Sequence, residues 1–121
     1  MCLGSVLQTY PPNDNMVVGY KVFDMANGKP ETSYRGVLCE VGKHHVATNG
    51  RIRASSGRTY EIGFHFFESF EDAKDECIPA WRARVYEVHL WDIRVVGMQW
   101  GKFVGVAKNM RIIGQVKEDS K

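Results

Sequence analysis

The segment Tyr60–Ala73 reads YEIGFHFFESFEDA and contains both kinds of secondary structure expected in this chain. Its first half alternates large apolar residues with small or polar ones, which predicts a β-strand from Tyr60 to Phe67. The apolar face would carry Tyr60, Ile62, Phe64 and Phe66. Ser69 then supplies a hydroxyl that can accept from a free amide of a first helical turn. The sequence therefore predicts a helix around residues 69–78, which ends before Pro79.

The segments on both sides of this unit are mostly strand-like. Alternation or β-branched residues predict strands at Val17–Phe23, Arg35–Val41, His44–Thr48, Arg84–Trp91, Ile93–Trp100, Lys102–Ala107 and Arg111–Val116. Gly101 marks a hairpin, and the short connections favour antiparallel pairing. One helix cannot cover both faces of such a sheet. The predicted fold class is therefore α+β, with a curled, mostly antiparallel, half-barrel-like sheet and one main α-helix.

Size and composition predict one domain over residues 1–121, with a flexible polar tail at about 117–121. No apolar run is long enough to cross a membrane, and the first residues do not resemble a signal peptide. The three cysteines have no close spacing that would indicate a disulfide framework. We therefore expect a cytoplasmic protein.

The charges are unevenly distributed although the net charge is only +2. Every charged residue between Glu40 and Glu61 is positive, namely Lys43, Arg51, Arg53 and Arg58. The region from Glu68 to Glu76 is mostly negative. The sequence thus predicts a basic loop and an acidic helix. The loop could bind an anion, or both segments could be ordinary solvated surfaces.

Aromatic residues lie within two positions of a cation at several places in the chain. A nucleotide needs both groups, because its base stacks on a flat surface and its phosphates bind cations. Alternatively, the aromatic rings pack the sheet and the cations extend past them into solvent. The predicted ligand-binding residues are Tyr20, Lys21, Tyr34, Arg35, Arg58, His65, Trp81, Arg82, Arg84 and Trp100.

A set of carboxylates and imidazoles could form a second kind of site. Glu61 and His65 share one strand face, as do Glu87 and His89. If the two strands were neighbours, these groups could bind a metal or transfer protons. The same spacing is common on a solvated sheet face. No catalytic residue, metal or cofactor is therefore assigned.

Several motifs in their order along the chain resemble small uncharacterised proteins of bacteriophages and prophages. The resemblance covers roughly Gly19 to Val116 and includes a Gly-Phe-His strand that leads into a helix. The matching segments are Gly19–Phe23, Cys39–Lys43, Gly63–Phe67, Ser69–Ala73, Tyr86–Val88 and Ala107–Ile113. The resemblance implies a location in the host bacterial cytoplasm. Some small phage proteins of this kind sequester nucleotide messengers of host defence, and the aromatic–basic pairs suit such ligands.

The leading hypothesis is therefore a phage-encoded binding protein, expected to be a homo-oligomer, that sequesters a nucleotide-derived immune signal. The candidate ligands are a cyclic ADP-ribose isomer, histidine-conjugated ADP-ribose or a cyclic dinucleotide. One alternative is a small enzyme that acts on a nucleotide or ADP-ribosyl group. Another is an inhibitor of a host protein, anchored by Trp91 and Trp100. Nucleic-acid binding ranks last, because the overall charge is nearly balanced.

Overall fold

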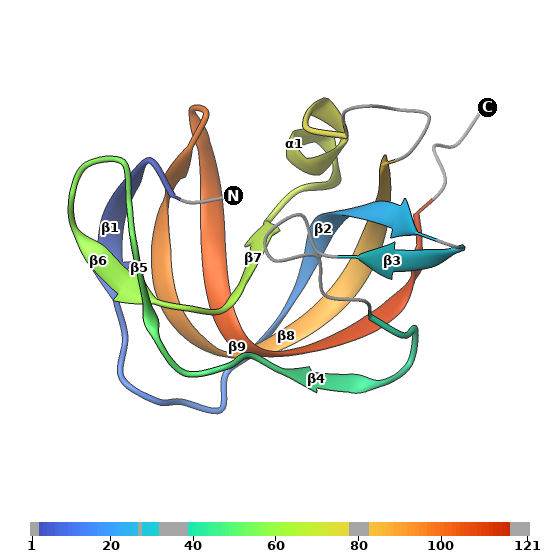
Figure 1. Cartoon of the computed structure of the whole chain (residues 1–121), viewed down its shortest axis with the longest axis horizontal. Coiled ribbons are helices and arrows are strands. Elements are labelled where there is room, and N and C mark those ends of the chain that lie inside the picture. Colours follow the sequence, from blue (N-terminus) through green and yellow to red (C-terminus); the bar gives the residue numbers. More distant parts are fainter. Residues whose placement is uncertain (1–2, 27, 32–38, 78–82, 117–121) are drawn as a thin grey trace.

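The computed structural model describes residues 3–26, 28–31, 39–77 and 83–116 of the chain. Figure 1 shows a strongly curved sheet, built on the long β8–β9 hairpin, with the helix α1 above its centre. In chain order the elements are β1 (Ser5–Thr9), β2 (Met16–Ala26), β3 (Lys29–Glu31), β4 (His44–Val46), β5 (Arg51–Arg53), β6 (Thr59–Glu61), β7 (Phe64–Phe67), α1 (Phe70–Asp75), β8 (Ala83–Gln99) and β9 (Lys102–Gln115).

The β8–β9 hairpin organises the sheet and confirms the turn predicted at Gly101. Gln99 pairs with Lys102 across a two-residue turn, in which Trp100 and Gly101 have φ angles of 52° and 76°. Two positive φ angles are typical of a turn whose twist matches that of the strands. The pairing register shifts between Ile93 and Val95, which marks a β-bulge. Since bulges bend the strand that carries them, the hairpin can curve along its length.

Four strands, β8, β2, β7 and β9, pair in this order, and β9 pairs back with β8 to close a ring. Among the described residues, the larger sheet has the order β1-β8-β2-β7-β9-β4, with β8 also paired to β9 and β3 attached to β2. β2 pairs with β8 from Met16 to Asp24, but it meets β7 at the single register pair Tyr20–Phe67. The result is a curled ring that is not quite a barrel, which confirms the predicted curled, half-barrel-like sheet.

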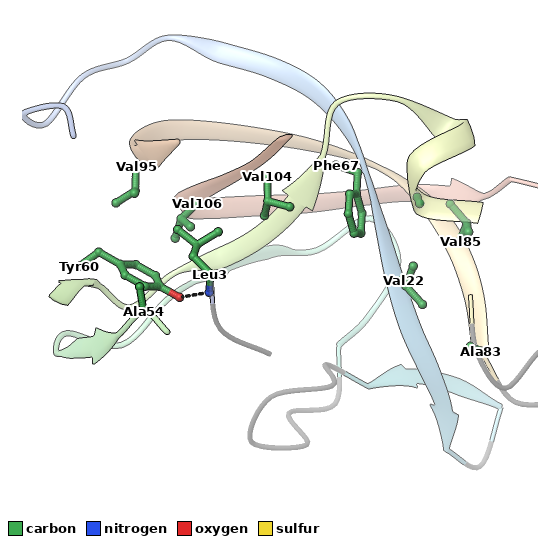
Figure 2. Close-up of a cluster of buried hydrophobic side chains, with 11 residues drawn as sticks. Leu3, Val22, Ala54, Tyr60, Phe67, Ala83, Val85, Val95, Val104 and Val106 are labelled. Atoms are coloured by element: carbon green, nitrogen blue, oxygen red, sulfur yellow. Dashed lines mark hydrogen bonds between the residues drawn. The ribbon is translucent and has the colours of Figure 1, made fainter. Parts of the chain in front are cut away.

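The ring buries one apolar cluster inside and a second outside. All four ring strands contribute to the inner cluster, with Phe23, Phe66, Val88, Leu90 and Met110 among its members. The outer cluster contains alternate residues of the same strands and is covered by α1 and by β5 and β6, which form a separate two-stranded sheet. Figure 2 shows Tyr60 and Ala54 of this cover beside Leu3. One face of the sheet is buried inside the ring, and α1 shares the cover of the other face with β5 and β6. One short helix is therefore sufficient to bury both faces.

The Phe66 side chain lies against two glycines on the neighbouring strands of the ring. A Cβ atom on Gly105 of β9 would be 2.4 Å from Cζ of Phe66. A Cβ atom on Gly19 of β2 would be 2.6 Å from its Cδ2. No residue with a side chain would leave room for the aromatic ring at these places. The Phe66 side chain therefore packs directly on the backbones of β2 and β9, the two strands that flank β7.

The predicted helix is present but shorter than expected. Ser69 is its N-cap and accepts a hydrogen bond from the Asp72 backbone N–H at 3.1 Å. The helix ends at Asp75, and the next residue, Glu76, binds Lys102 of β9 at 2.9 Å. This ion pair holds the end of the helix against the β8–β9 hairpin. Among the described residues, no helix has the length and apolar character needed to cross a membrane.

Other predicted boundaries were wrong. The strand expected over Tyr60–Phe67 divides into β6 and β7, because Ile62 and Gly63 belong to neither strand. A Cβ on Gly63 would be 2.6 Å from the Ala107 carbonyl oxygen, and Lys108 Nζ donates to the Ile62 carbonyl at 2.9 Å. The strands expected at 102–107 and 111–116 are one strand, β9. The strands β1, β3 and β5 were not predicted, and most of the strand predicted at 35–41 lies outside the described residues.

If Phe66 packs against bare backbone, Gly105→Ala should destabilise the protein by about 1–3 kcal/mol, because the new methyl group overlaps the aromatic ring. Gly114→Ala is the matched control on the same strand, since a Cβ at Gly114 meets nothing within 4 Å. Its expected effect is within about 0.5 kcal/mol. Urea unfolding of both variants measures the difference. Equal unfolding free energies for the two variants would contradict this packing.

Candidate functional site

A cavity of about 520 Å³ opens where β2 and β7 separate. The loop between β1 and β2 forms its rim, and Phe66 and Gly105 form part of its wall. Its volume lies within the range of about 300–1,000 Å³ that is typical of small-molecule sites. The lining residues are Tyr10, Asn13, Asn15, Val17, Val18, Phe66, Glu68, Ile93, Val96 and Gly105. The cavity is therefore largely apolar apart from Asn13, Asn15, Glu68 and the Tyr10 hydroxyl.

The rim loop is fixed to β8 by hydrogen bonds. The Asn13 side chain donates to the Ile93 carbonyl at 2.9 Å, and its backbone N–H donates to Asp92 Oδ1 at 3.0 Å. Asp92 has a positive φ of 60°, a strained conformation for a residue with a side chain. Arg94 holds it there with two bonds, at 2.8 and 3.1 Å. These interactions preform one side of the cavity.

Those bonds also set the charge around Asp92. The hydrogen bonds from Arg94 lower the pKa of the Asp92 carboxyl below its usual value, and the bond from the Asn13 backbone acts in the same direction. The Arg94 guanidinium binds a second carboxylate, Glu61 of β6, and its own pKa is raised by both acids. Asp92 is therefore ionised and paired at neutral pH. Its charge is compensated before any ligand arrives.

Among the described residues, the cavity lining contains one charged side chain, Glu68, and no cation. A carboxylate accepts hydrogen bonds and repels other anions. The Asn15 side chain offers an acceptor oxygen and two donor hydrogens. This lining suits an uncharged ring with N–H groups better than it suits a phosphate. The basic loop predicted from the sequence supplies none of the lining residues.

His65, predicted to face a ligand, is instead a core side chain with 7% exposure. Its Nε2 atom lies 2.9 Å from the Tyr60 hydroxyl, which in turn accepts from the Leu3 backbone N–H at 2.8 Å. Figure 2 shows the second of these bonds as a dashed line. These bonds connect the start of the chain to β6 and β7.

Burial makes the neutral form of His65 the favoured one. Loss of solvation lowers its pKa from 6.5 to about 3, and the positive charge of Lys21 acts in the same direction. A histidine with such a pKa carries no charge at neutral pH. It is therefore not available to bind a phosphate as a cation.

Lys21 is also buried and occupied. Its Nζ atom donates to the His65 carbonyl at 2.7 Å, beside the one register pair that joins β2 to β7. The ammonium thus binds a β7 carbonyl close to the point where backbone pairing between the two strands ends. Burial lowers the pKa of Lys21 from 10.5 to about 8. Lys21 therefore closes the ring and is not exposed to an external anion.

The four predicted acid–base residues take part in separate interactions. Glu61 pairs with Arg94, His65 bonds to Tyr60, and His89 lies 3.8 Å from Glu87. Within residues 3–26, 28–31, 39–77 and 83–116, no three histidine, cysteine or acidic side chains are placed to hold a metal ion. The strands that carry these four residues are not all neighbours, because Glu61 lies on the separate β5–β6 sheet.

The other predicted ligand-binding residues are dispersed. Tyr20 packs edge-on against Phe70 of α1, with ring centroids 6.0 Å apart. Arg84 donates to the Ala83 carbonyl at 2.8 Å. Arg58 is exposed near the β5–β6 turn, and Trp100 is 60% exposed at the tip of the β8–β9 hairpin. Tyr34, Arg35, Trp81 and Arg82 lie outside the described residues.

Of the ten residues predicted from the sequence to bind a ligand, the structure describes six, and none of these six lines the cavity. Residues 11–15 read Pro-Pro-Asn-Asp-Asn, a composition typical of turns, and this is the available signal in the sequence for an ordered loop. Nothing local to Glu68 or Val96 distinguishes them from other surface residues. They come together only through the strand order.

The chain matches no family model, no curated protein and no solved structure. The resemblance to phage proteins therefore stays a prediction. The function proposed below rests on the geometry of this chain.

The pKa of His65 predicts acid sensitivity. Between pH 6.5 and about 3 the unfolded chain binds a proton on His65 that the folded protein excludes. Stability should therefore fall as the pH decreases through this range. His65→Gln should flatten the decrease, and His89→Gln, which changes a half-buried histidine near Glu87, should follow the wild type. Urea unfolding between about pH 7.5 and about pH 4.5 tests this. Parallel pH curves for wild type and His65→Gln would refute the prediction.

Proposed function

We propose that this chain is a binding protein for a small nucleotide-derived molecule, and that the cavity between β2 and β7 receives an uncharged ring of that ligand. The observation that carries the proposal is the cavity itself: it has a preformed rim, an aromatic wall and a few polar groups. Such a combination is characteristic of small-molecule sites. Tyr10, which is 37% exposed, provides an accessible aromatic surface, Phe66 lies buried in the wall, and Asn15 and Glu68 provide hydrogen-bonding groups.

A nucleobase satisfies this chemistry better than a phosphate does. It is flat, it stacks on aromatic rings, and it presents ring or exocyclic N–H groups that a carboxylate or amide oxygen accepts. Glu68 would repel a phosphate placed in the cavity. The phosphates of the ligand would therefore remain at the mouth, in solvent. This division differs from the predicted site, in which cations surround the ligand.

The biological role proposed from the sequence is sequestration of a nucleotide-derived immune signal by a phage-encoded protein that forms homo-oligomers. Sequestration requires tight binding and no turnover, and a preformed cavity supports tight binding by reducing the cost of ordering. An enzyme that acts on the same ligand class would also need a cavity. Mass analysis of the ligand after incubation separates the two, since a binding protein returns the ligand intact.

The cavity assignment predicts the effect of filling it. Cyclic ADP-ribose isomers, histidine-conjugated ADP-ribose and cyclic dinucleotides should be tested one at a time by thermal melting. A ligand at about a hundredfold excess over its Kd should stabilise the wild type by about 2.7 kcal/mol. Val18→Trp places an indole at the cavity lining, where Val18 is 50% exposed, and should abolish this stabilisation.

Val46→Trp is the matched control, because Val46 is a strand valine with 64% exposure that does not line the cavity. It should leave the ligand-induced shift unchanged. If no ligand of the panel shifts the melting temperature, the proposed ligand class is wrong. If a ligand stabilises Val18→Trp as strongly as it stabilises the wild type, the ligand binds elsewhere.

A further inference from the structure

The β5–β6 hairpin carries a concentration of positive charge that the proposed function does not use. Arg51 pairs with Glu61 and Arg53 with Thr59 in the register of the two strands, so these four residues share one face. The opposite face, with Ile52 and Tyr60, packs against the outer apolar cluster. Both arginines on the outward face are exposed. The hairpin therefore turns its guanidinium groups toward solvent.

The acidic residue of this face is neutralised from another strand. Glu61 lies opposite Arg51, and an ion pair between them would be the ordinary cross-strand interaction. Arg94 of β8 binds the Glu61 carboxylate instead. Among the described residues, no carboxylate forms an ion pair with Arg51, Arg53 or Arg58. The positive charge of these three side chains is thus uncompensated within that part of the chain.

The arginines are also held in place by local hydrogen bonds. Arg51 donates to the Thr59 hydroxyl at 3.2 Å and to the Thr59 carbonyl at 3.0 Å. Arg53 donates to the Gly57 carbonyl at 3.0 Å. A guanidinium has five N–H donors, so each keeps at least two for a ligand. Ordering them in advance lowers the entropy that binding would otherwise cost.

The turn of the hairpin is anchored as well. The backbone N–H groups of Ser55 and Ser56 donate to the carbonyls of Leu3 and Gly4, at 2.9 Å in both cases. Ser55, Ser56 and Thr59 are exposed and lie in the same short hairpin as the three arginines. Arginine, serine and threonine side chains are among those that commonly contact nucleic-acid phosphates. The hairpin therefore has both the charge and the hydroxyl groups for such contacts.

We propose that the outward face and turn of the β5–β6 hairpin bind the phosphodiester backbone of nucleic acid. Arg51 and Arg53 are two residues apart on one strand, about 6.6 Å, which lets them contact neighbouring phosphates of an extended strand. The outward face defined by the β5–β6 register carries no aromatic residue, so we expect binding without base preference. Nucleic acid ranked last from the net charge of +2, but the structure concentrates positive charge on one surface. This inference is independent of the ligand proposed for the cavity.

Fluorescence anisotropy with a labelled, mixed-sequence single-stranded DNA of about 20 nucleotides tests the proposal on the full chain. The wild type should bind in about 50 mM salt and lose affinity steeply as the salt rises to about 200 mM. The triple substitution Arg51→Gln, Arg53→Gln and Arg58→Gln should weaken binding at least about tenfold. It should also reduce the slope of log affinity against log salt by about 2, at roughly 0.7 for each phosphate that is no longer neutralised.

The matched control removes the same charge from a different surface, through Lys29→Gln, Lys43→Gln and Arg111→Gln, all exposed residues. It should retain most of the affinity and the salt slope, and thermal melting should show that both triple variants are folded. Three results would overturn the proposal. The first is that the wild type shows no salt-sensitive binding to the DNA. The second is that both triple variants lose affinity equally. The third is that the arginine triple variant loses binding to anionic phospholipid vesicles but keeps its affinity for DNA.

Discussion

The Phe66 side chain is the constraint on which the rest of this structure depends. It occupies the space above the bare backbone of Gly19 and Gly105, on the two strands that flank β7 in the ring. Because β2 and β7 share one register pair, backbone hydrogen bonds alone contribute little to closing the ring there. The aromatic ring, together with the bond from Lys21 to the His65 carbonyl, compensates for the missing pairing. The same side chain forms part of the cavity wall.

Incomplete closure links the fold to the candidate site. Where β2 and β7 diverge, the sheet leaves the cavity that the β1–β2 loop borders. Arg94 stabilises this region through Asp92, which holds Asn13 of the rim. The same guanidinium binds Glu61 and so leaves the outward face of the β5–β6 hairpin positively charged. One partly buried ion-pair network therefore shapes the cavity and sets the charge of a separate surface.

Local patterns in the sequence predicted much of the fold and little of the site. Period-two alternation predicted the strand that contains Val88, the Ser69 hydroxyl predicted the start of the helix, and Gly101 predicted the hairpin turn. Each of these signals acts between residues that are close in the chain. The break after Glu61 depends instead on Ala107 and Lys108 of β9, so the alternation from Tyr60 to Phe67 gives no sign of it. Burial, and not residue type, decides what a polar side chain does: His65 and Lys21 are ligand-binding residue types, yet each completes hydrogen bonds inside the protein.

The most direct test of the cavity as a ligand site is an NMR titration of the ¹⁵N-labelled protein with ADP-ribose, followed through backbone amide shifts. We expect the largest shifts on the rim loop, at Tyr10, Asn13 and Asn15, and on Glu68 and Gly105, which also line the cavity. Saturation of these shifts would give the affinity of the site. Shifts confined to the β5–β6 hairpin, or no shifts either with ADP-ribose or with any ligand tested by thermal melting, would contradict the cavity as the ligand site.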